Sequence, residues 1–324
     1  MIKKEMYYDR ELSNSFSELI EPNGDLRWLF DFVIEHDDLD FLIGKNATKE
    51  WISVYRGLSR CITINPNGEI DGAKAYKDLV PDLYLNVKEK KDFRKELTEL
   101  LSKIKITKDF DRYYNNKKEG YFQNELSRKY GILSDSNSEF VIIDKEAVIG
   151  YESDITKKRI FGELRKKYKN LQTEISLKYE KIYGKDLQKK SLGNELDFIA
   201  LDKEGNLLLI EYKHDSNTSG IYLSPLQIGL YYDIFTNYPK KDLEKAIFKM
   251  LEQKQKIGLI SPLWKKPQSI KEIIPVLIIS EYNYKRSAKD KYMEIMNICR
   301  VKFGKTFLQN IKTYNYTSNT LTNW

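Results

Sequence analysis

The amino-acid sequence predicts a mixed α/β (α+β) protein, and three observations support this class. Two short apolar runs, 196–201 and 207–212, flank a five-residue turn Asp-Lys-Glu-Gly-Asn, which is typical of a β-hairpin. Helical periodicity precedes this hairpin at 160–182, and a helix start follows it at residue 224. Runs rich in aromatic and β-branched residues at 51–64 indicate a second, smaller sheet.

Residues 1–115 are predicted to form a smaller N-terminal α+β unit. Trp51–Tyr55 and Cys61–Ile64 are typical of strands because aromatic and β-branched residues alternate there, whereas Leu26–Ile34 fits a short helix or a strand. Phe93–Ile106 carries apolar residues at helical spacing, so we expect a helix to close the unit.

A polar stretch from Lys108 to Gly120 is expected to be a linker, which assigns residues 116–324 to a second domain. Periodicity predicts its remaining elements in chain order. They are a helix at Tyr121–Tyr130, a strand or hairpin at Phe140–Ile149, a strand at Ile273–Ile279, a helix at Ala288–Phe303 and a last strand near Phe307–Tyr316.

One segment supplies the positive charge of the chain. Between Lys157 and Lys190, twelve Lys or Arg residues stand against four acidic ones, a net +8 that leaves about −1 for the rest of a +7 chain. Apolar residues at helical spacing predict one long or two short helices that present the cations outward, followed by a short strand at Asp186–Lys190. Such a segment suits a DNA phosphate backbone, although an ordinary solvated helix face has the same composition.

Several classes of protein are disfavoured by composition. No apolar run approaches the roughly 20 residues that cross a bilayer, and the N-terminus lacks the apolar core of a signal peptide, so we expect a cytoplasmic protein with no membrane partner. Cys61 and Cys299 are too few and too far apart for a disulfide framework or a cysteine-based zinc site. With only His36 and His214, a histidine-rich metal site is not expected.

The predicted hairpin carries an acidic pair. If residue 201 faces residue 207, Asp197 stands opposite Glu211, about 5 Å away at Cβ, while the other face is apolar core. Close carboxylates destabilise a sheet unless a cation neutralises them, and Mg²⁺ prefers such oxygen ligands. Lys213 points to the same side, opposite Glu195, and could hold or deprotonate a water there.

The helix after the hairpin offers two further polar side chains. Ser224, Pro225 and Gln227 have the order of a helix N-cap, first position and third position. Gln227 and Tyr231 lie four residues apart, so they share one helix face. Gln227 could alternatively complete a capping box with Ser224.

An Asp on one strand, Glu-x-Lys ending the next, and then a helix with Gln-xxx-Tyr form an ordered set. Glu-x-Lys by itself also occurs at 89–91 and 252–254, so only its setting distinguishes Glu211–Lys213. The set resembles the PD-(D/E)XK nuclease superfamily, in its RecB-like branch, over roughly residues 155–280. This resemblance implies a restriction-endonuclease-like αβββαβ core.

The resemblance also implies roles for the matching residues. Asp197 and Glu211 would bind Mg²⁺ or Mn²⁺ together with the backbone carbonyl of Tyr212, and Lys213 would orient or activate the attacking water. Gln227 would support the metal site or DNA, and Tyr231 would buttress it. A third carboxylate is left open between Glu163, Glu174 and Glu195. The pattern departs from the family in having Leu196, not Pro, before Asp197.

We therefore expect a metal-dependent deoxyribonuclease that cuts DNA internally, with the N-terminal unit contributing target recognition or partner contacts. Analogy with similar nucleases suggests a role in restriction or defence. The alternatives are a nucleic-acid-binding module on a nuclease-like fold that does not cut, and a protein-interaction scaffold. Preference between DNA and RNA is not readable from the sequence, and homodimerisation stays open.

Overall fold

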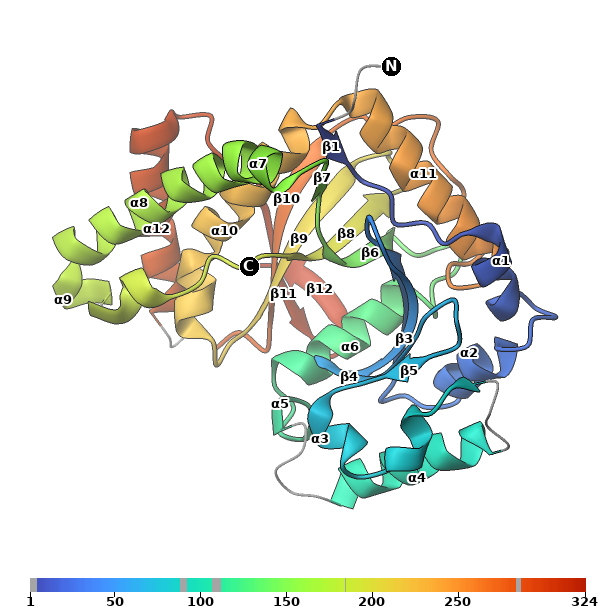
Figure 1. Ribbon diagram of the computed structural model, residues 1–324. Coiled ribbons are helices and arrows are strands. Elements are labelled where there is room, and N and C mark those ends of the chain that lie inside the picture. Colours follow the sequence, from blue (N-terminus) through green and yellow to red (C-terminus); the bar gives the residue numbers. More distant parts are fainter. Residues whose placement is uncertain (1–4, 88–91, 107–111, 184, 284–286) are drawn as a thin grey trace. The chain divides into compact units, whose positions relative to one another are not determined.

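The computed structural model describes residues 5–87, 92–106, 112–183, 185–283 and 287–324 (Figure 1). The chain forms two compact units. Unit 1 comprises 1–8, 142–246 and 267–324, and unit 2 comprises 9–141 and 247–266. This division differs from the boundary at residue 115 that the linker composition suggested. Within unit 2, the segment after that boundary is tied to the N-terminal sheet by buried hydrogen bonds such as Ser127 to Asp40, at 2.5 Å.

Unit 2 contains an antiparallel sheet in the order β2-β3-β4-β5. Its strands are β2 Asp40–Lys45, β3 Glu50–Arg56, β4 Ser59–Ile64 and β5 Ile70–Asp71. The helices around it are α1 Asn14–Ser17, η1 Glu18–Ile20, α2 Arg27–Ile34, α3 Lys74–Lys77, η2 Pro81–Tyr84, α4 Phe93–Ile106, α5 Arg112–Asn115 and α6 Glu119–Tyr130. The predicted strands at 51–55 and 61–64 and the helix at 93–106 are confirmed.

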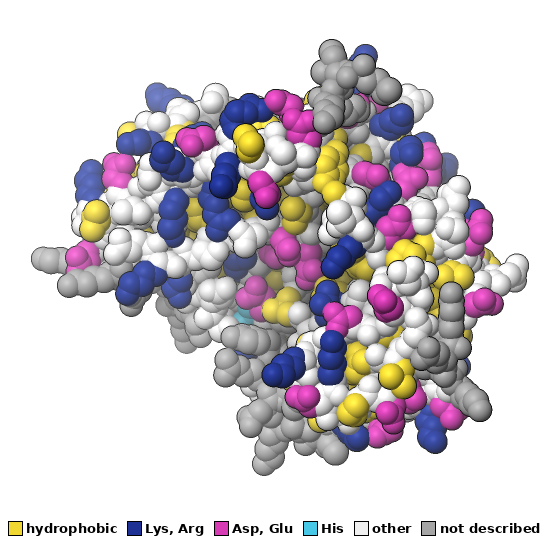
Figure 2. Space-filling model, in the orientation of Figure 1, with side chains coloured by type: hydrophobic (Ala, Val, Ile, Leu, Met, Phe, Trp, Pro, Cys, Tyr) yellow, Lys and Arg dark blue, Asp and Glu magenta, His cyan; other side chains and the backbone are white. Residues whose placement is uncertain are grey.

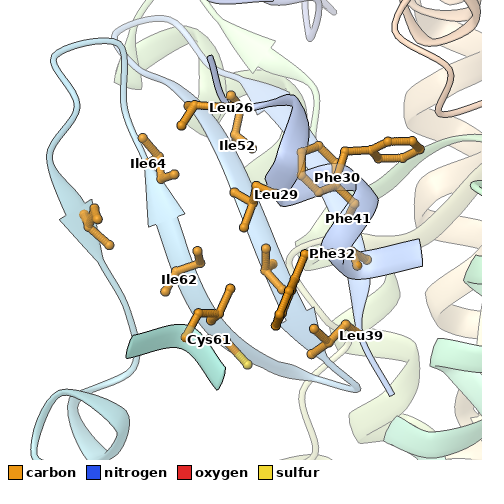
Figure 3. Packing of buried hydrophobic residues seen from close by; sticks show 14 of the residues in the cluster. Leu26, Leu29, Phe30, Phe32, Leu39, Phe41, Ile52, Cys61, Ile62 and Ile64 are labelled. Atoms are coloured by element: carbon orange, nitrogen blue, oxygen red, sulfur yellow. The ribbon is translucent and has the colours of Figure 1, made fainter. Parts of the chain in front are cut away.

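Apolar side chains of α2 pack onto the sheet of unit 2. Leu29 and Phe32 lie over Ile52 and Ile62, and all four are at most 2% exposed (Figure 3). The short segment at 26–34 is therefore a helix, because its apolar residues recur at helical spacing toward this core. Of the predicted linker at 108–120, residues 112–115 and 119–120 are helical and lie within unit 2, and residues 108–111 lie outside the described residues.

Arg128 on α6 binds backbone carbonyls at the carboxyl end of α2, within unit 2. Its guanidinium donates hydrogen bonds to the carbonyls of Val33 at 2.9 Å, Leu39 at 2.5 Å and Ile34 at 3.2 Å, and its side chain is 4% exposed. The last carbonyls of a helix have no partner within it, and a cation is favoured at this negative end of the helix dipole. Arg128 therefore supplies a charged donor to carbonyls at and just beyond the end of this helix, of which that of Val33 also accepts from the His36 amide at 3.2 Å.

Unit 1 is built on a six-stranded sheet in the order β12-β11-β10-β9-β8-β6. Its strands are β6 Phe140–Ala147, which begins in unit 2, β8 Leu196–Asp202, β9 Leu207–His214, β10 Ile273–Ser280, β11 Lys312–Thr317 and β12 Thr320–Asn323. Strand β9 is antiparallel to β8 and parallel to β10. A two-stranded ribbon pairs β1 Met6–Tyr7 with β7 Gly150–Tyr151. Strand β12 was not predicted.

The helices of unit 1 include one long central helix, α10, which runs between α8 and α12 and packs onto β9 and β10 (Figure 1). The helical segments are α7 Asp154–Lys157, the π-helical turn η4 Lys158–Gly162, α8 Glu163–Lys178, α9 Glu180–Tyr183, η5 Lys185–Lys189, α10 Thr218–Asn237, α11 Lys240–Lys256, which continues into unit 2, and α12 Ala288–Phe303. Helix α11 was not predicted. No helix among the described residues is long and apolar enough to cross a membrane.

The hairpin register is confirmed. Leu201 pairs with Leu207, and the ladder continues to Phe198 opposite Ile210. The turn is held by Asp202, whose carboxylate accepts hydrogen bonds from the backbone and side-chain amides of Asn206 at 2.7 and 2.9 Å. Local turn chemistry thus sets the pairing along the whole hairpin.

The predicted start of α10 at Ser224 is wrong. The helix begins at Thr218, capped by the Asn217 side chain, which accepts from the Gly220 amide at 3.0 Å. Pro225 lies inside the helix and cannot donate to the carbonyl of Ile221 four residues earlier. The buried Ser224 hydroxyl donates to that carbonyl instead, at 2.7 Å. Ser224 therefore replaces the missing hydrogen bond inside the helix, and it does not act as an N-cap in a capping box with Gln227.

The predicted strand at Asp186–Lys190 is also wrong, because this segment is the 3₁₀ helix η5. Side chains of α8 hold it against that helix: Gln172 donates to the Leu187 carbonyl at 2.7 Å, and Lys169 donates to the carbonyls of Gln188 and Lys190 at 2.6 and 2.8 Å. With these carbonyls engaged by side chains, the segment does not extend into a sheet.

Candidate active site

Lys213 lies between the two carboxylates that the hairpin register brought together. Its ammonium contacts the Glu211 carboxylate, lies 3.6 Å from Asp197 Oδ2 and donates to the backbone carbonyl of Tyr212 at 2.9 Å. Asp197 Oδ2 also accepts from the Tyr212 amide at 2.7 Å. Two carboxylates and one carbonyl, from the facing ends of β8 and β9, therefore converge on a single cation.

This acidic site is largely shielded from water. The side chains of Glu211 and Lys213 are 3% and 8% exposed, and that of Asp197 is 26% exposed. Two carboxylates facing one ammonium carry a net charge of −1, which is costly to bury. The neighbouring strand β10 flanks these residues in the sheet, with Ile279 paired to Lys213 and Leu277 paired to Glu211.

The donor set at the acidic site fits a hard divalent cation. Oxygen atoms of carboxylates and carbonyls are the ligands of Mg²⁺ and Mn²⁺, and the ammonium already marks the point on which they converge. Within the described ranges, no three Asp, Glu, His or Cys side chains stand close enough together to hold a metal. The set therefore consists of Asp197, Glu211 and the Tyr212 carbonyl.

Gln227 and Tyr231 do share one face of α10, as their spacing predicts. A Cβ built on Gly193 would lie 3.2 Å from the Tyr231 hydroxyl and 3.5 Å from Gln227 Nε2, so both side chains meet the backbone just before β8. Gly193 has φ +77°, and its backbone approaches both side chains closely, which only glycine allows comfortably.

Tyr231 is electrostatically linked to the acidic site. Burial, and then the nearby carboxylates of Glu211 and Asp197, raise the pKa of its phenol, so the hydroxyl stays protonated. Tyr231 is 3% exposed, and its hydroxyl has no hydrogen-bond partner among the described residues. It is consequently a hydrogen-bond donor available to an incoming oxygen.

The three candidates for a third carboxylate differ in their surroundings. Glu174 is exposed and pairs with Lys302 of α12 at 3.0 Å, and Glu163 is exposed on the first turn of α8. Glu195 is exposed two residues before Asp197 and is close enough to Tyr231 to raise its pKa further. The described contacts bring Glu195, but not Glu174, next to the residues of the acidic site.

Arg165 of α8 lies near Asn194 and Tyr231, although the sequence marks it only as one of twelve cations in the basic segment. It donates to the side chain of Asn194, and its charge acts on Tyr231 in the direction opposite to the carboxylates. The sequence does not predict the contact of Arg165 with Asn194, because the two residues lie on separate segments, 29 residues apart.

The chain matches no protein-family model, and it matches none of the curated proteins or solved structures with which it was compared.

Proposed function

We propose that this chain is a Mg²⁺- or Mn²⁺-dependent endonuclease that hydrolyses DNA phosphodiester bonds. The observation that carries the proposal is the convergence of Asp197, Glu211 and the Tyr212 carbonyl on the ammonium of Lys213. These three groups would hold the divalent ion. When bound, the ion supplies Lewis-acid polarisation of the phosphate and lowers the pKa of a water.

The chain's own residues contribute the remaining chemistry. A Lys213 ammonium displaced from the carboxylates stays within reach of the phosphate, where it orients the attacking water and stabilises developing negative charge. Gln227 and Tyr231 support the site from α10, and the Tyr231 hydroxyl can donate a hydrogen bond to the substrate. Among the described residues no third carboxylate stands close enough to join Asp197 and Glu211, so Glu195, which lies near Tyr231, would face the substrate rather than the metal.

The topology of unit 1 supports this proposal. Strands β6, β8 and β9 are neighbours in that order, α10 follows β9, and β10 then returns parallel to β9. This order would supply the βββαβ part of the restriction-endonuclease-like core that the sequence resemblance implies. The helix α8 lies in the chain between β6 and β8, rather than before the first strand. A role in restriction or defence is an analogy from fold alone.

The basic segment supports DNA as the partner. Lys and Arg side chains gather on the surface over α7 and α8 (Figure 2). Some are committed to ion pairs, such as Lys167 with Asp233 at 3.0 Å, whereas Lys157, Lys158 and Lys166 are exposed. A positively charged face next to a phosphodiesterase site raises the local concentration of a polyanion.

Cleavage of plasmid and linear DNA with Mg²⁺ or Mn²⁺ tests the activity. We expect Asp197→Ala and Lys213→Ala to lower the rate by about 100-fold or more, since each removes charge from the reacting centre. Glu204→Ala and Lys203→Ala are matched controls in the exposed turn of the same hairpin and should cut like the wild type. Equal cleavage by all five proteins would sink the assignment.

One observation favours a second candidate, a nucleic-acid-binding module that does not cut. The Lys213 ammonium already neutralises one of the two carboxylates, so the cluster forms an ion-paired network without metal. This alternative predicts salt-sensitive DNA binding with no cleavage under any divalent metal.

A further inference from the structure

A pocket of about 310 Å³ lies beside the acidic site within unit 1. Aromatic rings form much of its wall, contributed by Tyr151 of β7, Phe161 of η4 and Phe235 of α10. Its volume is at the lower end of the range of about 300–1,000 Å³ for small-molecule pockets, and flat apolar walls suit a planar ring. The pocket is therefore sized for one ring system with its substituents and not for a duplex.

The pocket is preformed by packing rather than by loose loops. A Cβ on Gly150 would come within 2.2 Å of the Tyr7 ring, so the ribbon β1–β7 is closely packed behind the Tyr151 wall. Phe235 is held by an edge-on contact with Tyr8, with ring centroids 5.7 Å apart. Rigid aromatic walls reduce the entropy that a bound ring must offset.

Polar groups line another part of the pocket and have the chemistry of nucleotide recognition. Lys157 comes from the basic segment and is exposed, while Asn194 and Glu195 supply an amide and a carboxylate. Arg165 donates to the Asn194 side chain and lies over the Phe161 ring at 5.7 Å. Amide and carboxylate groups hydrogen-bond base edges, whereas the cations favour the phosphate.

Tyr231 joins the pocket to the acidic site. It lines the pocket together with Glu195, which stands two residues before Asp197 in the chain. Asp197 and Glu211 also lie close enough to Tyr231 to raise the pKa of its phenol. Its hydroxyl is buried without a hydrogen-bond partner among the described residues, which is rare for a buried polar group. A nucleotide whose base enters the pocket therefore has its adjoining phosphate near the acidic site.

We propose that this pocket binds one unpaired nucleobase of single-stranded DNA and so positions the neighbouring phosphate for cleavage. The inference deepens the proposed function and rests on it for the cleavage step alone. A base inside a duplex cannot enter a pocket, so it must be unpaired or flipped out. The enzyme thus prefers single strands, overhangs or frayed ends over an intact duplex.

Filling the pocket tests this inference. Val148, 38% exposed, lines the pocket, and Val301 of α12 is 89% exposed and does not, so Val148→Trp and Val301→Trp are a matched pair. Binding is measured in EDTA by fluorescence anisotropy of a fluorescein-labelled single-stranded oligonucleotide and of its blunt duplex. We expect Val148→Trp to weaken single-strand binding by about 10-fold, as for loss of one stacked base, with duplex binding changed less than about twofold.

A second variant guards against misfolding. Phe161→Ala removes one wall and should weaken single-strand binding similarly, whereas Leu177→Ala, at a 67% exposed position of α8, should not. Thermal melts of each variant confirm folding. Unchanged single-strand affinity in folded Val148→Trp overturns the inference, as does equal loss for both substrates or absence of single-strand binding by the wild type.

The binding measurement separates this inference from the proposed activity. Selective single-strand binding without cleavage in Mg²⁺ or Mn²⁺ contradicts the proposed hydrolysis and leaves the base pocket standing. Cleavage with no effect of Val148→Trp contradicts the pocket and leaves the hydrolysis standing.

Discussion

Replacing Lys213 by Met removes the ammonium that separates two buried carboxylates, and we expect a large loss of stability. Glu211 is 3% exposed and loses its cation, so it must either hold an unpaired buried charge or take up a proton on folding, and both cost free energy. Asp197 Oδ2 lies 3.6 Å from the same ammonium and loses that contact too. Removing one member of a buried pair costs about 3–5 kcal/mol. For a unit of this size the melting temperature should fall by about 6–20 °C.

Divalent metal should restore that stability. In Lys213→Met the ammonium no longer competes for Asp197, Glu211 and the Tyr212 carbonyl. A ligand at about 100 times its Kd stabilises the folded state by about 2.7 kcal/mol, so Mg²⁺ or Mn²⁺ should raise the melting temperature of Lys213→Met more than that of the wild type.

Differential scanning fluorimetry with and without each metal measures both effects. Lys203→Met, in the exposed turn of the same hairpin, is the control and should melt like the wild type. Adding Glu211→Gln to Lys213→Met should recover part of the loss, because the unpaired buried charge is gone. The reasoning is refuted if Lys213→Met is as stable as the wild type, or if neither metal shifts its melting temperature.

Three further predictions follow from buried groups. Ser224→Ala should cost about 1–3 kcal/mol in chemical denaturation, because the Ile221 carbonyl, to which Pro225 cannot donate, loses the Ser224 hydroxyl as a donor. Thr236→Ala, at an exposed hydroxyl, should cost much less, and equal costs would contradict this. Arg128→Met should lower the free energy of unfolding by about 2–4 kcal/mol, since three carbonyls lose a charged donor. Arg94→Met, at an exposed ion pair, should lower it by about 0–1 kcal/mol. A small loss in both variants would refute the role given to Arg128. Burial raises the pKa of the Cys299 thiol to about 12, so it stays protonated below that pH and should resist iodoacetamide at pH about 8 until the chain is unfolded; rapid native labelling would contradict this.

Local patterns in the sequence determined much of unit 1. The hairpin register follows from the turn chemistry of Asp202–Asn206 and the two-residue alternation of its strands, and the helix Ala288–Phe303 follows from its apolar periodicity. Because these signals act between residues close in the chain, they place Asp197 and Glu211 on one face without knowledge of the rest of the fold.

Tertiary contacts decided the start of α10. The sequence predicts a start at Ser224 because Pro225 suits the first helical position, but the helix is capped seven residues earlier by Asn217. With this earlier start Ile221 and Leu223 are at most 2% exposed, and the Ser224 hydroxyl compensates for the proline. Burial of this additional turn outweighs the local preference of one residue.

The surroundings of the acidic pair likewise depended on the tertiary structure. Sequence periodicity placed Glu163 and Glu174 beside the apolar stripe of their helix, but Glu174 pairs with Lys302, more than a hundred residues away. The sequence by itself determined which carboxylates face each other, because strand alternation is local. The same alternation placed Lys213 and Glu195 on that face. Only the folded chain decided that the Lys213 ammonium reaches both carboxylates and that Tyr231 and an aromatic pocket stand beside them, since these contacts depend on side-chain packing and on segments outside the hairpin.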